Sequence, residues 1–224
     1  MDKNIIEIKY KEGFYVDIVL SANNLKFDDI IDYPSIKIMR NKITFIWGES
    51  GCGKTTLLKL FNATLSPSTG EISYNNRNTF DMDTVQLRKE ITLVSQTVFL
   101  FDKTIEENFN EFYKYRDIKP LSKEDMKKYL CICCADFDLS AQCERMSGGE
   151  RQRVFIAICL SFLPKVLMLD EPTSALDSET ANRFFENTKL FCSKNEITLI
   201  VISHDKTLAD KFADEKILLE KRGI

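Results

Sequence analysis

The apolar residues of this chain fall into short runs separated by stretches with helical spacing. Four runs have the length and composition of a strand buried on both faces, and they lie at residues 43–47, 91–94, 166–169 and 197–202. The stretch after the first run carries on one helical face Leu57, Leu58, Phe61 and Leu65. Because such runs and helical stretches alternate, the pattern predicts an α/β fold with a parallel sheet and crossover helices.

The start of the chain has a different pattern, in which apolar and polar residues alternate. Residues 5–10 alternate, Glu12 and Gly13 provide a turn, and residues 14–20 form a second mixed segment. We therefore predict a β-hairpin ahead of the first buried strand.

Residues 99–145 show helical patterns alone. Thr104 with Glu107 has the spacing of a capping box, and Ser122 with Asp125 has it too if aspartate replaces glutamate. The helical face after the second cap carries Met126, Tyr129, Leu130 and Cys133. This segment predicts a helical insert within the α/β fold.

A glycine-rich segment joins the first buried strand to its helix and matches the pattern G-x-x-x-x-G-K-[ST]. It consists of Gly48, Glu49, Ser50, Gly51, Cys52, Gly53, Lys54, Thr55 and Thr56. Such a loop points successive N–H groups inward, and the helix N-terminus adds partial positive charge. In this pattern Lys54 reaches the β- and γ-phosphates and Thr55 ligates Mg²⁺. An ordinary glycine-rich turn is the alternative, but the strand, lysine, threonine and helix together favour a nucleoside-triphosphate site.

The third buried run ends in two carboxylates, Asp170 and Glu171. In phosphate-loop enzymes an aspartate at this position holds Mg²⁺, and a second carboxylate can polarise the attacking water as a general base. The alternative is a strand that leaves the core into a solvated turn at Pro172. The phosphate loop upstream favours the catalytic interpretation.

The segment from Met146 to Arg153 has the sequence MSGGERQR. Ser147 and Glu150 have capping-box spacing ahead of an apolar helix, which is the structural alternative. A cap does not require the two glycines Gly148 and Gly149, however. Glycines and a small hydroxyl leave bare N–H groups at a helix N-terminus, which predicts an anion site.

Together these segments resemble the ATP-binding cassette (ABC) family, whose signature is usually Leu-Ser-Gly-Gly-Gln or a variant with Glu. Gln96 stands where the family has its Q-loop glutamine, and residues 170–177 resemble its Walker B motif and D-loop. His204 follows the last buried run, where the family's switch histidine belongs. A lone histidine is more often a core or solvent-facing residue, but this position favours the switch role. The resemblance covers about residues 36–212.

The resemblance implies a fold as well as a function. The implied fold is α/β: a P-loop NTPase (RecA-like) core with an N-terminal antiparallel β-subdomain and an inserted helical subdomain. Residues 1–224 would form a single nucleotide-binding domain, with the helical subdomain at about 99–152 and Gln96 as the joint between subdomain and core.

The resemblance also implies a mechanism in which two cassettes pair head to tail around ATP. ATP binding then closes the dimer and hydrolysis opens it. Glu171 would activate water, with His204 at the γ-phosphate. The residues implied to hold phosphate and magnesium are Lys54, Thr55 and Thr56, with Gln96 and Asp170 completing the metal sphere. The signature residues, acting on ATP held by the partner cassette, would be Ser147, Gly148, Gly149 and Glu150, while Asp177 belongs to the D-loop.

Two features depart from the family pattern. The family usually stacks an upstream aromatic residue on adenine, and the candidates here are Phe27, then Tyr10 and Tyr33, none at the expected spacing. The Gly-Glu that commonly precedes the first core strand is replaced by Asn41-Lys42, which should affect only a turn.

Cys131 and Cys134 have the C-x-x-C spacing of a metal site, with Cys133 between them. Only Cys143 and the distant His204 could complete a tetrahedral set. The helical periodicity of this segment favours buried thiols instead.

Composition limits the function classes. The chain has 224 residues, a net charge of −3 and seven cysteines. The negative charge argues against nucleic acid as a partner, and the odd cysteine count favours reduced thiols in the cytoplasm. No apolar run reaches the length of a membrane span, and the start does not resemble a signal peptide. We expect a protein of the cytoplasm, bound peripherally to the cytoplasmic face of the membrane.

The leading interpretation is therefore the ATP-hydrolysing subunit of an ABC transporter, acting as a dimer of cassettes, with two identical copies favoured, on a separate transmembrane permease. Phe99, Leu100 and Phe101 either pack in the core or, as a group, line the groove where that permease docks. The alternative is a non-transport ABC ATPase, such as that of iron–sulfur cluster assembly. The C-terminal half most resembles short bacterial cassettes of iron or metal exporters.

Overall fold

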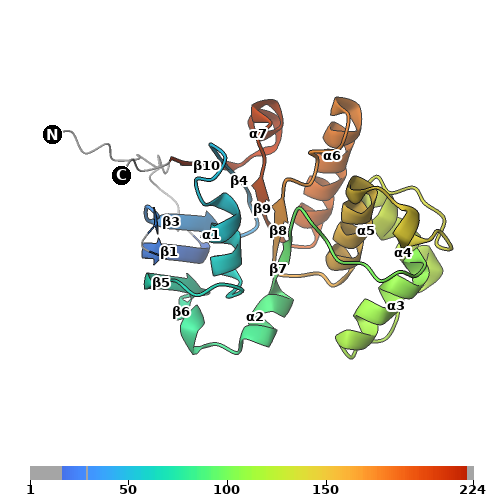
Figure 1. The fold of residues 1–224 in the computed structure, drawn as a ribbon, viewed down its shortest axis with the longest axis horizontal. Coiled ribbons are helices and arrows are strands. Elements are labelled where there is room, and N and C mark those ends of the chain that lie inside the picture. Colours follow the sequence, from blue (N-terminus) through green and yellow to red (C-terminus); the bar gives the residue numbers. More distant parts are fainter. Residues whose placement is uncertain (1–16, 29, 221–224) are drawn as a thin grey trace.

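The computed structural model describes residues 17–28 and 30–220 (Figure 1). The first arm of the predicted hairpin, residues 5–10, lies outside the described residues, and so do residues 14–16 of the second. From Ile18 the chain continues as a long strand, β1 (Ile18–Phe27), which extends well beyond the predicted end at Leu20.

Two sheets and a set of helices form the described part of the chain. The further strands are β2 (Ile31–Asp32), β3 (Ile36–Met39), β4 (Ile43–Gly48), β5 (Thr69–Tyr74), β6 (Arg77–Asn78), β7 (Ile91–Val94), β8 (Val166–Asp170), β9 (Thr198–Ile202) and β10 (Glu215–Leu219). The α-helices are α1 (Lys54–Phe61), α2 (Thr84–Glu90), α3 (Ile105–Tyr115), α4 (Lys123–Ile132), α5 (Gly148–Ser161), α6 (Ser178–Lys194) and α7 (Lys206–Phe212), and the 3₁₀ turns are η1 (Thr79–Asp81) and η2 (Cys143–Arg145).

The first sheet is antiparallel, with the strand order β2-β1-β5-β6 and β3 paired to β1. Strand β1 is its centre, because it pairs with β5 on one side and with β3 on the other. This confirms the N-terminal antiparallel subdomain. Strand β5 has no distinctive pattern in the sequence, and its pairing with β1 provides the order.

The second sheet is parallel, with the strand order β10-β4-β9-β8-β7. Strands β4, β9, β8 and β7 of this sheet are the four apolar runs of the sequence, so the α/β prediction is confirmed. Since the strands are parallel, the carboxyl ends of β7, β8 and β9 meet at one edge of the sheet. The residues that follow these strands are therefore neighbours in space.

Strands β4, β7, β8 and β9 are buried on both faces, and their residues alternate between two apolar clusters, whereas the edge strand β10 is buried on one face only. Phe45 and Leu169 belong to the cluster shared with the helical insert, α5 and α6. Ile46 and Met168 belong to the cluster shared with α1 and the antiparallel sheet. Helix α1 accordingly lies between the two sheets (Figure 1).

Helix α1 is shorter than the apolar spacing predicts. It ends at Phe61, and Ala63 adopts a left-handed φ of 54°. The backbone N–H groups of Thr64 and Leu65 then donate to the carbonyl oxygen of Lys59. Leu65 therefore lies in the turn after the helix, although it still packs against the cluster beneath it.

The predicted insert is helical, and α3 and α4 lie beside α5 and α6 at one side of the molecule (Figure 1). Thr104 and Glu107 form the predicted capping box of α3. Ser122 caps α4 by accepting from the N–H of Asp125, but the Asp125 carboxylate accepts from the serine hydroxyl and not from the Ser122 N–H, so the capping box is incomplete. Among the described helices, none has both the length and the apolar character needed to cross a bilayer.

Candidate nucleotide-binding site

The loop between β4 and α1 begins and ends with glycines that no other residue could replace without strain. At Gly48 a Cβ would lie 2.1 Å from the carbonyl oxygen of Leu219 in β10. Gly53 has a φ of 97°, and a Cβ there would lie 2.8 Å from the Tyr33 hydroxyl. The adjacent strands therefore force the tight wrapping that the sequence pattern predicts, with residues 49–52 between these two glycines.

Lys54 folds back into this loop. Its ammonium donates hydrogen bonds to the carbonyl oxygens of Gly48, at 2.9 Å, and Glu49, at 2.8 Å. The side chain is only 6% exposed, so a positive charge is held inside the loop. No side chain caps the helix at Gly53, and its first turn has no acidic residue. The positive end of α1 is therefore left for an anion.

Thr55 and Asp170 meet across the site. The Thr55 hydroxyl donates to Asp170 Oδ2 at 2.8 Å. Asp170 is 4% exposed, and burial, with a smaller contribution from the charge on Glu171, raises the pKa of its carboxyl. Hydroxyl and carboxylate oxygens are the ligands that Mg²⁺ prefers, so this pair fits the predicted metal.

Gln96, Glu171 and His204 converge although each follows a different strand. Glu171 Oε1 lies 2.8 Å from His204 Nε2, and Gln96 Nε2 donates to Glu171 Oε2 at 3.2 Å. The amide nitrogen of Gln96 contacts the glutamate, and the predicted place of Gln96 in the metal sphere stays a prediction. The structure thus brings the three predicted catalytic side chains together.

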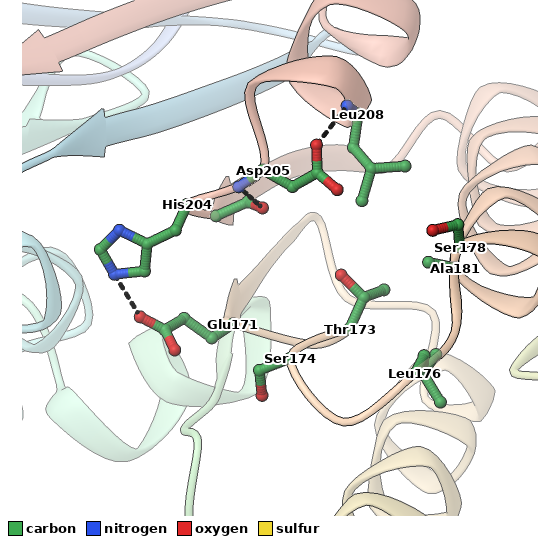
Figure 2. A pocket seen from close by; sticks show the side chains of 10 residues that line it. Glu171, Thr173, Ser174, Leu176, Ser178, Ala181, His204, Asp205 and Leu208 are labelled. Atoms are coloured by element: carbon green, nitrogen blue, oxygen red, sulfur yellow. Dashed lines mark hydrogen bonds and ion pairs between the residues drawn. The ribbon is translucent and has the colours of Figure 1, made fainter.

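A cavity of about 360 Å³ opens beside the Glu171–His204 pair (Figure 2). Thr173 and Leu176, which follow β8, line one side, and Asp205 and Leu208, which follow β9, line another. At about 30 Å³ for each water in the liquid, this space holds on the order of ten water molecules. Water therefore has access to the carboxylate that is predicted to activate it.

The segment at the N-terminus of α5 forms the capping box that its spacing predicts. The Ser147 N–H donates to Glu150 Oε2 at 2.8 Å, and the Ser147 hydroxyl accepts from the Glu150 N–H at 3.4 Å. The Ser147 hydroxyl also donates to Glu150 Oε2 at 2.8 Å, and this bond, together with the one from the Ser147 N–H, lowers the pKa of the Glu150 carboxyl, so it is charged at neutral pH. The structure thus shows the structural alternative, and the anion site stays a prediction.

The two glycines of this segment have different explanations. A Cβ at Gly149 would lie 2.8 Å from the Cβ of Ala175, so packing within the chain requires a glycine there. At Gly148 a Cβ would meet no described atom within 4 Å. Packing among the described residues therefore gives no reason for a glycine at Gly148.

Asp177, the predicted D-loop residue, is the N-cap of α6 and accepts from the N–H of Thr180 at 2.9 Å.

Tyr33, a candidate for stacking on adenine, is 3% exposed and donates its hydroxyl to the carbonyl oxygen of Gly53 at 2.9 Å. Tyr33 thus holds the phosphate loop through its hydroxyl, and its buried ring is not free to stack on adenine. The suggestion that Tyr33 stacks on adenine was therefore wrong. Tyr10 lies outside the described residues, and Phe27 is partly buried. Asn41 takes a left-handed φ of 55°, so it replaces the family's glycine within a turn, as predicted.

The cysteines of the insert differ in exposure. Cys133, Cys134 and Cys143 are buried, and burial raises the pKa of the Cys133 thiol. Cys131 is exposed, so the expectation of buried thiols was wrong for this residue. It occupies the solvent side of α4, where its position follows from the same helical periodicity.

The sequence reasoning missed Gln152, which is 4% exposed. Its side-chain amide donates to the carbonyl oxygens of Asp170, at 3.1 Å, and Ser95, at 3.4 Å. Its signal in the sequence is a polar residue four positions before Ile156 on the buried face of a helix, where an apolar residue is usual.

Comparisons with known proteins agree with this geometry. A family model described as ABC transporter matches residues 31–174. The chain is 33% identical to the osmoprotectant import ATP-binding protein OsmV of Salmonella typhimurium, over 86% of this chain and 51% of OsmV. It is 29% identical to the probable iron export ATP-binding protein FetA of Escherichia coli, over 85% of this chain and 84% of FetA.

A solved structure is similar as well. The bacterial ABC transporter cassette MJ0796, solved as a dimer, matches with a TM-score of 0.80 and 25% identity, over 92% of this chain and 100% of that one. The chain spans about half the length of the first curated relatives, at 51% for OsmV and 51% for the choline transport ATP-binding protein OpuBA of Bacillus subtilis.

Proposed function

Since this chain belongs to the ABC transporter family, we propose that it is the ATP-hydrolysing subunit of an ABC transporter. The observation that carries the proposal is the convergence of Gln96, Glu171 and His204 beside the loop that holds Lys54. A phosphate-binding loop alone serves many kinds of NTPase, whereas a carboxylate held between a glutamine and a histidine is suited to activating water at the γ-phosphate.

In this proposal the loop of residues 48–56 holds the phosphates, because its helix N-terminus has no side-chain cap and Lys54 provides a buried positive charge. Thr55 and Asp170 would hold Mg²⁺, which would supply charge neutralisation at the phosphates. The carboxylate of Glu171 would accept the proton of the attacking water, and His204, whose Nε2 lies 2.8 Å from the same carboxylate, would contact the γ-phosphate.

The site also requires a second cassette. Ser147, Gly148, Gly149 and Glu150 form an exposed helix N-terminus, and Gly148 has no packing requirement within the described chain. We propose that these residues close over ATP held by a partner cassette, with Asp177 nearby on the D-loop. The dimeric structure of MJ0796 supports this arrangement.

A permease would dock on an aromatic patch that follows Gln96. The patch consists of Phe99, Phe101, Phe112 and Tyr115, with ring centroids 5.0–6.1 Å apart. Phe99 is 65% exposed and Tyr115 is 72% exposed, which is unusual for large apolar rings at a monomer surface. Docking there would hold the protein at the cytoplasmic face of the membrane. The relatives OsmV and FetA are named for import and for export, so the proposal includes neither cargo nor direction.

The test is a Glu171→Gln variant, which removes the general base and keeps the shape of the side chain. We expect ATP turnover to fall at least about 100-fold, and sedimentation velocity with ATP and Mg²⁺ to show a stable dimer. Glu196→Gln, an exposed glutamate in a turn, is the matched control and should behave as wild type. Adding Lys54→Ala to Glu171→Gln should abolish the dimer. A Glu171→Gln protein that stays monomeric with ATP and Mg²⁺ would refute the shared site.

A further inference from the structure

The peptide unit between Asp170 and Glu171 is held at both ends. The N–H of Glu171 donates to the carbonyl oxygen of Ile202 in β9 at 3.0 Å. The carbonyl oxygen of Asp170 accepts from Gln152 Nε2 at 3.1 Å. Because a peptide unit is planar, these two bonds from opposite sides determine its orientation.

The orientation of this peptide decides where the Glu171 side chain points. Glu171 has a φ of 50°, in the left-handed region that glutamate rarely adopts. Such a conformation persists only when the surroundings hold it. If the peptide rotated, the carboxylate would leave the positions from which it contacts His204 and Gln96.

The same amide group of Gln152 reaches a second strand end. Nε2 carries two hydrogens, and it also donates to the carbonyl oxygen of Ser95, at 3.4 Å. Ser95 immediately precedes Gln96, just as Asp170 immediately precedes Glu171. The Gln152 side chain therefore bonds the backbone carbonyls that immediately precede Gln96 and Glu171. The side chains of these two residues contact each other at 3.2 Å.

Gln152 itself is firmly placed. It is 4% exposed and lies in the second turn of α5, the helix that begins with the capping box of Ser147 and Glu150. The helix N-terminus that would face the partner's ATP and the strand ends that carry this chain's catalytic groups are thus joined through one buried amide.

From this geometry we propose that Gln152 is a positioning residue for ATP hydrolysis, which orients Glu171 and Gln96 from the signature helix. The inference rests on the proposed ATPase function. Gln152 contacts no phosphate-loop residue in the bonds described, so its loss should lower kcat and leave KM for ATP nearly unchanged. Misplacement of a catalytic group by about 1 Å costs up to about 100-fold in rate.

The experiment compares wild type with Gln152→Met, which keeps the length of the side chain and removes both donors. We expect kcat to fall about 10- to 100-fold, with KM for ATP changed by less than about twofold. Gln152→Asn keeps the donors on a shorter side chain and should give an intermediate kcat, and it provides the measurement if the methionine variant does not fold. Gln86→Met, at an exposed position of α2, is the matched control and should retain wild-type kcat.

A double-mutant cycle separates positioning from a merely structural role. In a Glu171→Gln background the carboxylate is already absent, so adding Gln152→Met should lower the single-turnover rate by a smaller factor than it does in wild type. Three results would each overturn the inference: full additivity of the two losses, a rise in KM with unchanged kcat, or a wild-type kcat in Gln152→Met. In each case, ATP turnover by the wild-type protein would still uphold the proposed function. Absence of ATP turnover in the wild-type protein would refute both.

Discussion

The carboxylate of Glu150 is predicted to have opposite effects on the free chain and on the ATP-bound dimer. It lies in the first turn of α5, where it accepts hydrogen bonds from Ser147 and stays charged at neutral pH. In the proposed dimer this helix N-terminus faces the triphosphate of the partner cassette. Glu150→Gln keeps the shape and can still accept from the Ser147 N–H, so the change isolates the charge.

In the free chain the charge is favourable. A carboxylate at an exposed helix N-terminus contributes about 0.3–1 kcal/mol, so Glu150→Gln should lower the free energy of unfolding by a few tenths of a kcal/mol. The hydrogen bonds with Ser147 lower the folded pKa below its ordinary value of 4.5. The contribution is therefore fully present above that value and disappears as pH falls through the folded pKa.

In the dimer the same charge is unfavourable. If the separation is taken as about 8 Å, two unit charges repel by about 2 kcal/mol at an effective dielectric constant of 20. Salt at physiological strength screens over about the same distance, which reduces this to about 1 kcal/mol at each site. With two equivalent sites, Glu150→Gln should tighten the dimer by about 2 kcal/mol, or about 30-fold.

The assay is sedimentation equilibrium of Glu171→Gln and of Glu171→Gln/Glu150→Gln with ATP and Mg²⁺, at 0.05 M and 0.5 M salt. The gain should be larger at low salt. Urea unfolding without nucleotide, at neutral and acidic pH, measures the effect on the free chain. A dimer that is weakened by Glu150→Gln, or a gain that is independent of salt, would contradict the assigned position of this carboxylate.

Two further predictions concern Asp170 in the nucleotide site and Phe99 in the aromatic patch. Burial raises the folded pKa of Asp170 above 3.8, so the ionised group destabilises the nucleotide-free fold above that pKa and the cost disappears as pH falls. Asp170→Asn should therefore unfold at a higher urea concentration than wild type at neutral pH. It should also lose the increase of about 2.7 kcal/mol in the free energy of unfolding that Mg²⁺-ATP at 100 times its Kd gives wild type. Lower stability of the variant without nucleotide would contradict this prediction. Phe99→Ser should reduce the fraction that sediments with native membranes several-fold and leave ATP turnover unchanged, whereas Phe80→Ser, at another exposed phenylalanine, should change neither; equal loss in both variants would argue against the aromatic patch.

Local features were readable from the sequence because they depend on short spacings. The phosphate loop, the capping boxes at Thr104 and Ser147, and the buried strands at 43–47 and 166–169 each involve residues a few positions apart. Their hydrogen bonds or burial periods follow from local backbone geometry. The same patterns misplaced Leu65, because tertiary packing and a left-handed residue ended the helix first.

The sequence by itself determined which residues could bind a triphosphate, and from the motif order it indicated the family. Tertiary structure alone decided that Gln96 and His204 both contact the Glu171 carboxylate. It also decided that Tyr33 supports the phosphate loop and that Gln152 connects two strand ends. Strand order explains the difference: β10-β4-β9-β8-β7 does not follow chain order, so these contacts join residues far apart in sequence. Long-range pairing leaves no periodicity in either segment, because it depends on how whole strands and helices pack.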